Sequence, residues 1–330
     1  MNILISGGTG FIGSHLLSRF LGEGNRCRCL VRRTKNLPAV FNNDNVELFK
    51  GDVDDVNSLE NIGEKIDVAY HLAGAGHVAA VSRKHSKTAF DVNVKGTRNF
   101  IETCALTGVK RIIHFSSTAA MGLIRAPKID ETMPCRPTTP YQMSKYKGEQ
   151  IAIEAGNKLG IEVVVLRPCM VYGPGGKGEF FKFCRLIKNG IFPRIGMGKN
   201  LTPIVYVEDV VQAAVNALYK GKRGQVFLIA SARSHPMVEI HKLICEALDV
   251  RRFYPYVPVW LAYLVAFFME QIAIRTGKPP TVSRMNIISV ATGRVFDIRR
   301  AMQSLSYKPN MGLRLGITET VSYFRTNHLL

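Results

Sequence analysis

The segment SGGTGFIG, Ser6 to Gly13, follows an apolar stretch at the start of the chain and precedes an amphipathic one. Its glycines fit two overlapping spacings, G-x-x-G-x-x-G from Gly7 and G-x-G-x-x-G from Gly8. Glycine permits positive φ in such a turn and lets the backbone approach a phosphate without an intervening side chain. The helix that follows offers free N–H groups and a partial positive charge. In this strand–loop–helix context the segment predicts a dinucleotide-binding loop.

Short apolar runs alternate with amphipathic helical stretches through the first two-thirds of the chain. The expected strands are Asn2–Ser6, Arg26–Arg32, Val46–Lys50, Asp67–Leu72, Arg111–Ser116, Glu162–Arg167 and Gln225–Ala230. The expected helices include Phe11–Leu21, Thr88–Leu106, Pro140–Leu159 and Val207–Tyr219. This alternation, with continuous Val/Ile/Leu runs in several strands, predicts an α/β fold of the Rossmann type, a doubly wound parallel sheet with helices on both faces.

The pattern changes near Ser231, after which helical stretches, a proline-rich patch and short polar links follow one another. We therefore expect two parts. Residues 1–173 and 205–230 form a nucleotide-binding domain, and residues 174–204 and 231–330 form a smaller, mainly helical substrate-binding lobe.

The end of the second expected strand bears on the choice of dinucleotide. A fold that prefers NAD places Asp or Glu there to bind the ribose 2′-hydroxyl. This chain has Arg32 and Arg33 instead, and two guanidinium groups suit a 2′-phosphate. The sequence therefore predicts NADP, with NAD as the alternative cofactor and solvated surface charge as the other explanation of the arginines. Asp52, after the third strand, is placed to accept a hydrogen bond from the adenine amino group.

Composition limits the other classes of function. The chain has 44 Lys and Arg against 25 Asp and Glu, a formal charge of +19, in scattered small clusters. No basic stripe, zinc finger or aromatic platform organises them, so we expect no nucleic-acid partner; phosphorylated ligands, an anionic membrane or solubility explain the charge better. The seven cysteines include no C-x-x-C pair, which predicts reduced thiols, no metal site and a cytoplasmic protein. The first expected strand begins beside Met1, so we expect no signal peptide.

A second short segment, YQMSK from Tyr141 to Lys145, opens the helix expected at Pro140. Thr139 can cap that helix, and proline suits its first position. A spacing of four residues puts the phenol and the ammonium on one helical face. The same pattern arises by chance in many helical proteins, so on its own it decides nothing.

Several motifs, taken in order, resemble the extended short-chain dehydrogenase/reductase superfamily, which includes the NAD-dependent epimerase/dehydratase family. Besides the glycine loop and YQMSK they are HLAG (71–74), NVKGTRN (93–99), FSSTAAMG (115–122), LRPCMVYGPG (166–175) and VYVEDV (205–210). The resemblance runs from residue 3 to about residue 325. It implies an enzyme that transfers a hydride between a nicotinamide and a secondary alcohol or ketone.

The resemblance implies a catalytic set of three residues. Tyr141 is the general acid/base, and Lys145 with the bound nicotinamide is expected to lower the pKa of its phenol from the free value near ~10. Lys145 also binds the nicotinamide ribose. Ser117 polarises the substrate oxygen, with Ser116 and Thr118 as alternatives.

The same resemblance extends the cofactor site along the chain. The residues it assigns to the cofactor are Gly7, Gly10, Phe11, Ile12, Gly13, Arg32, Arg33, Asp52, Val53, Ala73, Gly74, Asn93, Tyr141, Lys145, Pro168 and Cys169. Relatives also pair the helices expected at Thr88–Leu106 and Pro140–Leu159 into a four-helix bundle, which predicts a homodimer.

Two departures from the superfamily pattern bear on the substrate. Its sugar-nucleotide epimerases and dehydratases usually have Asn within R-x-x-N-V-Y-G-P, and an Arg before V-x-D-V that holds the nucleotide phosphate. This chain has Cys169-Met170 and the segment 201–204, LTPI, at these places. With segments 257–269 and 296–309, the pattern resembles the 3β-hydroxysteroid and sterol-carboxylate dehydrogenase or ketone reductase branch. It predicts an apolar steroid-, terpenoid- or polyphenol-like substrate. The alternative is a nucleotide-sugar 4-epimerase or dehydratase with tightly bound NAD.

The most apolar segment is VPVWLAYLVAFFMEQI, Val257 to Ile272. It is uncharged only from Val259 to Met269, and a spanning helix needs ~20 apolar residues, so we expect it not to cross a bilayer. The favoured interpretation is a core helix of the substrate lobe. The alternative is peripheral contact with an anionic membrane. The basic residues that flank the segment are Arg251, Arg252, Arg275 and Lys278.

Overall fold

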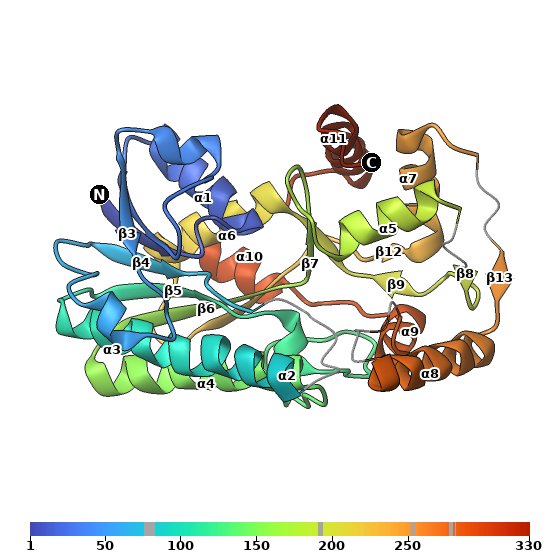
Figure 1. The fold of residues 1–330 in the computed structure, drawn as a ribbon, viewed down its shortest axis with the longest axis horizontal. Helices are drawn as coiled ribbons and strands as arrows, with labels where there is room; N and C mark the ends of the chain where they lie inside the picture. The colour runs from blue at the N-terminus through green and yellow to red at the C-terminus, as the bar shows by residue number, and fades with distance from the viewer. Residues whose placement is uncertain (76–82, 191–193, 252–254, 277–279, 281) are drawn as a thin grey trace.

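The computed structural model describes residues 1–75, 83–190, 194–251, 255–276, 280 and 282–330 (Figure 1). Seven parallel strands form one sheet in the order β11-β6-β5-β4-β1-β2-β3. Their bounds are β1 Asn2–Ser6, β2 Arg26–Val31, β3 Val46–Lys50, β4 Val68–His71, β5 Arg111–Phe115, β6 Glu162–Pro168 and β11 Val226–Ile229. The predicted parallel sheet is confirmed, and the ends of its strands differ by at most one residue from those expected.

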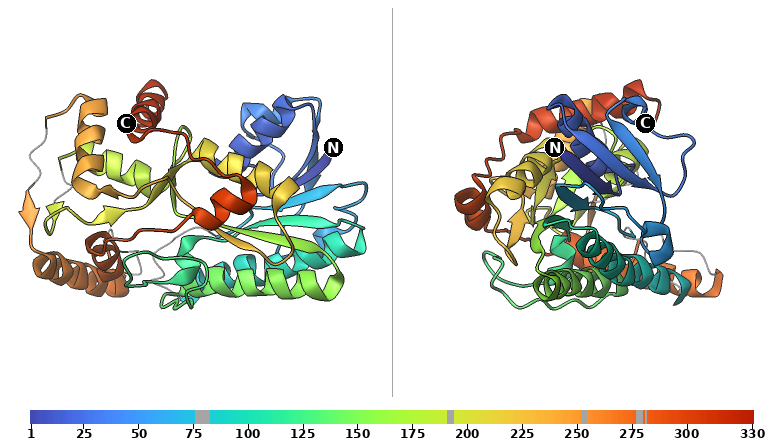
Figure 2. Two further views of the ribbon diagram at one scale, coloured as in Figure 1. Left: turned by 180° about the vertical axis from the view of Figure 1, so that it is seen from behind. Right: turned by 90° about the vertical axis from the view of Figure 1, so that its left-hand side faces the viewer.

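Helices cover both faces of this sheet (Figures 1 and 2). The helices on the first face are α1 (Phe11–Gly22), α6 (Val207–Lys220) and α10 (Arg299–Leu305). Their Leu16, Val210 and Leu305 are buried with the strands in one core. The second face carries two helices side by side, α3 (Thr97–Leu106) and α4 (Pro140–Leu159). Phe100 and Ala152 are buried there in a second core. Coverage on both faces explains why β1 and β6 contain unbroken apolar runs, at residues 3–5 and 163–166.

The helix expected at Thr88–Leu106 is present, but it begins earlier, at Arg83, and contains a π-helical turn that was not predicted. The segment consists of α2 (Arg83–Phe90), a π-helical turn (Asp91–Gly96) and α3. Helix α4 approaches the turn so closely that a Cβ on Gly148 would lie 2.1 Å from the carbonyl oxygen of Asn93. π-helical turns inside helices are frequent at functional sites.

A second group of helices packs together in the part of the chain expected to form the substrate lobe. These helices are α5 (Glu179–Lys188), α7 (Met237–Leu248) and α11 (Leu313–Thr326). Phe180, Ile240 and Phe324 are buried among them. Three short strand pairs accompany the lobe: β7 (Met170–Tyr172) with β10 (Ile204–Tyr206), β9 (Leu201–Thr202) with β12 (His235–Pro236), and β8 (Arg194–Ile195) with β13 (Tyr256–Val257). Helices α8 (Val259–Thr276) and α9 (Arg284–Ala291) lie at the end of the molecule opposite the N-terminus (Figure 1).

The division into residues 1–173 plus 205–230 and residues 174–204 plus 231–330 stays a prediction. One segment within the expected lobe packs on the nucleotide-binding sheet. Phe296 and Tyr307, on either side of α10, are buried in the core under α1 and α6. The Tyr307 hydroxyl donates to the Ala230 carbonyl at 2.9 Å. The chain thus returns to the sheet after α9.

Candidate active site

The loop between β1 and α1 has the backbone geometry that its glycines predict. Gly7 has φ +75°, and a Cβ there would lie 2.7 Å from the backbone that follows β4. A Cβ on Gly13 would lie 2.2 Å from the carbonyl oxygen of Gly7, so only glycine allows α1 to start this close to β1. Gly10 is the N-cap, and Phe11 and Ile12 open the first turn. Among the described residues no side chain caps α1 and no acid occupies its first turn. Its positive end therefore suits a pyrophosphate.

The residues predicted to bind the adenosine half follow β2 and β3. Both strands run parallel to β1, so their carboxyl ends reach the sheet edge that carries the glycine loop. Arg32 and Arg33 are exposed just after β2. The backbone N–H of Asp52 donates to Ser58 Oγ at 2.9 Å, and Ser58 Oγ donates back to the Asp52 carbonyl at 3.1 Å. Val53, which follows, is buried against α3 and accepts from Asn99 through its carbonyl at 2.9 Å. These bonds hold the turn that presents Asp52.

Behind the glycine loop, a buried chain of hydrogen bonds runs from β1 to the π turn. The Ala73 N–H donates to Ser6 Oγ at 3.3 Å, and Ser6 Oγ lies 2.7 Å from His71 Nδ1. His71 Nε2 lies 3.0 Å from Thr97 Oγ1, which donates to the Asn93 carbonyl at 2.8 Å. Since Thr97 donates onward, the neutral imidazole donates through Nε2 and accepts at Nδ1. Burial, with a smaller effect of the Lys145 charge, lowers the pKa of His71 to about 3. The sequence motifs did not predict this role of His71.

Asn93 joins the segment after β4 to α4. Its Oδ1 accepts from the Ala75 N–H at 2.9 Å, and its Nδ2 donates to Ser144 Oγ at 2.9 Å. A Cβ on Gly74 would lie 3.0 Å from Asn93 Oδ1 and 3.4 Å from Lys145 Nζ. Asn93, predicted to bind the cofactor, therefore positions the backbone beside Lys145. Ser144 was not predicted, although it lies within YQMSK.

The three predicted catalytic side chains meet at the carboxyl end of β5. The Tyr141 hydroxyl hydrogen-bonds with Ser117, whose Oγ also accepts from the Ala119 N–H at 3.1 Å. Lys145 Nζ donates to the Phe115 carbonyl at 3.0 Å. The capping box at Thr139, which includes a bond to its Oγ1 from the N–H of residue 142 at 3.3 Å, defines where α4 begins and hence where its first turn places these groups.

The other two candidate hydroxyls lie deeper in the protein. Ser116 and Thr118 are both buried, and Ser116 Oγ has no hydrogen-bond partner within the described part of the chain. Of the three, Ser117 is the hydroxyl that hydrogen-bonds with Tyr141.

The pKa values of this pair differ from the expectation. Burial raises the pKa of Tyr141, and the hydrogen bond with Ser117 opposes only part of that rise. Burial lowers the pKa of Lys145 to about 8, while the Glu149 carboxylate acts in the opposite direction. In the protein alone the expected lowering of the phenol pKa is therefore absent. The reason is that burial dominates at Tyr141 while Lys145 Nζ is engaged by the Phe115 carbonyl.

A buried ion pair fixes α4 to the strand that leads to Pro168 and Cys169. Arg167 Nε donates to Glu149 Oε2 at 2.8 Å, and a second bond joins Arg167 Nη2 to Glu149 Oε1. Both side chains are buried. At the end of β6 the Cys169 N–H donates to the Ile229 carbonyl at 3.0 Å. The pair therefore sets how α4, with Tyr141, stands relative to the predicted nicotinamide contacts.

Arg294 is a cation near this position that the motifs did not predict. It is close enough to Cys169 for their charges to interact, and its Nη2 donates to Ser289 Oγ at 3.1 Å. Its buried Nε has no hydrogen-bond partner among the described residues. No motif singled it out, because Arg294 stands two residues before the segment 296–309 to which the resemblance extends.

The sequence profile described as "NAD dependent epimerase/dehydratase family" matches residues 3–230. The chain belongs to this family. The matched range contains the glycine loop, Ser117, Tyr141 and Lys145, so the resemblance to the extended short-chain dehydrogenase/reductase superfamily is confirmed, and the protein is an enzyme of that type.

Relatives match along nearly the whole chain. A UDP-glucose 4-epimerase of Mycolicibacterium smegmatis is 29% identical over 98% of this chain and 99% of its own length. The 3beta-hydroxysteroid-dehydrogenase/decarboxylase isoform 1 of Arabidopsis thaliana is 28% identical over 97% of this chain and 79% of its own. The crystal structure of UDP-glucose 4-epimerase with UDP-glucose from Thermotoga maritima has a TM-score of 0.80 at 25% identity, covering 99% of this chain and 100% of that one. The chain also matches a longer Arabidopsis enzyme, of which it spans 39%.

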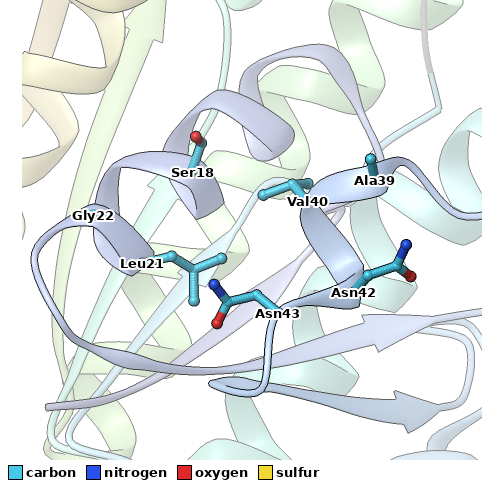
Figure 3. A pocket seen from close by; sticks show the side chains of 7 residues that line it. All are labelled: Ser18, Leu21, Gly22, Ala39, Val40, Asn42 and Asn43. Atoms are coloured by element: carbon cyan, nitrogen blue, oxygen red, sulfur yellow. The ribbon is translucent and has the colours of Figure 1, made fainter.

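An open pocket of about 460 Å³ lies between the C-terminal half of α1 and residues 39–43 (Figure 3). The residues that line it are Ser18, Leu21, Gly22, Ala39, Val40, Asn42 and Asn43. These include the C-terminal end of α1, whereas the glycine loop precedes its N-terminal end. None of the predicted site residues lines the pocket, so it is separate from the candidate active site. In the described parts of the chain, no group of His, Cys, Asp and Glu is arranged to hold a metal ion.

Proposed function

We propose that the protein uses a nicotinamide dinucleotide to oxidise and re-reduce a secondary hydroxyl of a sugar carried on a nucleotide diphosphate, as a 4-epimerase does. The observation that carries this proposal is the similarity to a UDP-glucose 4-epimerase over 98% of this chain, substrate lobe included, around an assembled Ser117–Tyr141–Lys145 set. The alternative considered from the sequence is thus preferred to the apolar substrate.

The residues of this chain supply the proton chemistry. When Tyr141 is deprotonated, its Oη takes the proton of the substrate hydroxyl, while the Ser117 hydroxyl donates a hydrogen bond to the same oxygen. Lys145 keeps its positive charge below its pKa of about 8 and stabilises the phenolate. The bound nicotinamide supplies hydride acceptance and return. Tyr141 then gives its proton back to the oxygen, so the enzyme ends as it began.

Arg294 supports a phosphorylated substrate. Its Nε is buried without a hydrogen-bond partner among the described residues, and burial lowers the pKa of the guanidinium. A buried guanidinium N–H without a partner is costly, and a phosphate oxygen is a strong acceptor for it. At Cys169-Met170 and at 201–204 this chain lacks the polar residues that sugar-nucleotide enzymes of the superfamily usually have. Arg294, close to Cys169, provides a polar group there instead.

A second candidate is oxidation of an apolar 3β-hydroxysteroid-like alcohol. Two observations favour it: the apolar Cys169-Met170 pair, and 28% identity over 97% of the chain to a plant 3β-hydroxysteroid dehydrogenase/decarboxylase. This reaction would leave the cofactor reduced after each turnover, whereas epimerisation regenerates it.

The two candidates differ in a measurable stoichiometry. We expect purified protein to convert UDP-sugars into their 4-epimers with no net reduction of added cofactor. Tyr141→Phe should lower turnover by about 10²–10⁴-fold because the proton acceptor is lost, while dinucleotide binding survives. Tyr219→Phe, on an exposed tyrosine of α6, is the matched control and should change neither quantity.

Stoichiometric cofactor reduction with 3β-hydroxysteroids, and no conversion of any UDP-sugar, would establish the second candidate instead. Full activity of Tyr141→Phe would refute the role of Tyr141 in both.

A further inference from the structure

Helix α8 exposes a continuous apolar face. Trp260, Leu264, Phe268 and Ile272 recur every four residues, and Leu261 is exposed beside them. The exposed fractions of Trp260, Phe268 and Ile272 are 68%, 56% and 60%. The expectation of a core helix is therefore wrong. A contiguous apolar patch of this kind on a soluble domain marks an interaction surface.

The opposite face explains why these side chains remain outside. Ala262 and Ala266 are buried against Ile287 of α9, and small residues allow the two helices to pack closely. Arg284 Nε donates to Glu270 Oε2 at 2.6 Å, which ties α9 to α8. The Arg284 guanidinium also lies 5.2 Å from the centre of the Phe267 ring, so α9 covers this side of α8. Trp260, Phe268 and Ile272 remain more than half exposed.

The connections of α8 favour a helix lying on a surface over one crossing a membrane. By length and composition α8 could span a bilayer. Yet β13, immediately before α8, pairs with β8, and α9, which follows α8 and packs along it, also contacts β8. The segments on both sides of α8 are therefore held by the same strand. Such a helix places one face in the interface plane.

We propose that the outer face of α8 docks on the surface of an anionic lipid bilayer. The charge of +19 attracts the chain to such a surface. Locally, Arg275 is exposed in the last turn of the helix, where it can meet lipid phosphates, and Arg251 is exposed before β13. A second copy placed symmetrically on this face would instead bring like charges together. Trp260 and the exposed Tyr256 suit the headgroup boundary.

This surface is independent of the substrate proposed above. Docking would hold the part of the chain that carries α8 at the membrane, whichever substrate the active site takes.

Trp260 is the only tryptophan of the chain, so its fluorescence reports on α8 alone. The full-length protein is mixed with vesicles of phosphatidylcholine, or of phosphatidylcholine with phosphatidylglycerol, with and without brominated acyl chains. We expect a blue shift of the emission and quenching by the brominated lipid in the anionic vesicles. High salt should weaken the association.

The variant Leu264→Glu/Phe268→Glu places two charges on the apolar face and should lower vesicle partitioning by at least about tenfold. Leu315→Glu, on an exposed leucine of α11, is the control and should bind vesicles like the wild type. Circular dichroism checks that both variants fold. Absence of lipid quenching, or equal partitioning of the double variant and the control, would overturn the proposal. Self-association that the double variant abolishes, without any lipid quenching, would overturn it too and assign the face to a second copy.

Discussion

Individual residues of the candidate site act through neighbours that are distant in the sequence. His71 connects Ser6 of β1 to Thr97 of α3 and, through Thr97, to the carbonyl of Asn93. The amide of Asn93 in turn holds Ala75 and Ser144. A polar network buried in this way requires all its members to be satisfied, which restricts the backbone around Lys145 to one arrangement.

The buried histidines predict a pH dependence of stability. Burial lowers the pKa of His71 to about 3 and also lowers that of His114. Between about pH 6.5 and pH 3 the unfolded chain therefore binds more protons than the native protein, so the free energy of unfolding falls as the pH is lowered through this window. His71→Gln should reduce the fall between about pH 7 and pH 5 by about 2 kcal/mol, measured by urea unfolding. His328→Gln, at an exposed site, is the control; an unchanged fall in the His71 variant would contradict the explanation.

The prediction that the protein prefers NADP to NAD depends on Arg32 and Arg33. If they bind the 2′-phosphate, replacing both by Ser should weaken NADPH binding by at least about tenfold and leave NADH binding nearly unchanged. Isothermal titration with the two cofactors measures this. Arg26→Ser, at the exposed opposite end of β2, is the control. Equal losses for NADPH and NADH would show that the arginines do not read the 2′-phosphate.

At the scale of elements, the positions of α1 and α4 depend on places where two backbones approach closely at a glycine. Helix α1 starts against the Gly7 carbonyl, and α4 rests on the Asn93 carbonyl through Gly148. Both contacts exclude any side chain larger than that of glycine.

Two glycines of α1 allow a matched test. Gly13→Ala would place a Cβ 2.2 Å from the Gly7 carbonyl oxygen, so it should destabilise the protein by about 1–3 kcal/mol and abolish dinucleotide binding. An added Cβ on Gly22 of the same helix meets nothing within 4 Å. Gly22→Ala should therefore be neutral or stabilise by up to about 1 kcal/mol. Urea unfolding and cofactor titration test both; similar behaviour of the two variants would contradict the close-approach argument.

At the scale of the whole molecule, the sheet carries α3 and α4 together on one outer surface (Figure 1). This surface has charges of both signs, with Arg98 paired to Glu102 on α3 and exposed Lys147 and Glu154 on α4. Because charges of both signs are present, two copies can approach each other through this surface without net repulsion. The basic residues near α8 would repel each other in the same arrangement.

The homodimer remains a prediction for this surface. Light scattering should give a mass of twice the 36.7 kDa chain. Leu106, 87% exposed at the end of α3, should be covered in the dimer, so Leu106→Glu should weaken association. Leu315→Glu on α11 should not. A monomeric wild-type protein at working concentration would reject the prediction.

Sequence alone determined the features that depend on local backbone preference. The glycine spacing predicted the turn after β1, and alternation of apolar runs predicted all seven sheet strands to within one residue. Thr139 and Pro140 predicted the first residue of α4. Each of these signals is contained in a few consecutive residues, because capping and turn formation are short-range.

Tertiary structure alone decided which residues meet. The resemblance favoured Ser117 but left Ser116 and Thr118 as alternatives, and only the placement of α4 against β5 brings Ser117 to the Tyr141 hydroxyl. The orphan Nε of Arg294 likewise depends on where residues 293–296 run. The exposure of α8 could not be predicted either, because an apolar segment has the same composition whether or not a neighbour covers it. Burial depends on packing against residues that are distant in the sequence, so the residues of one segment do not determine it.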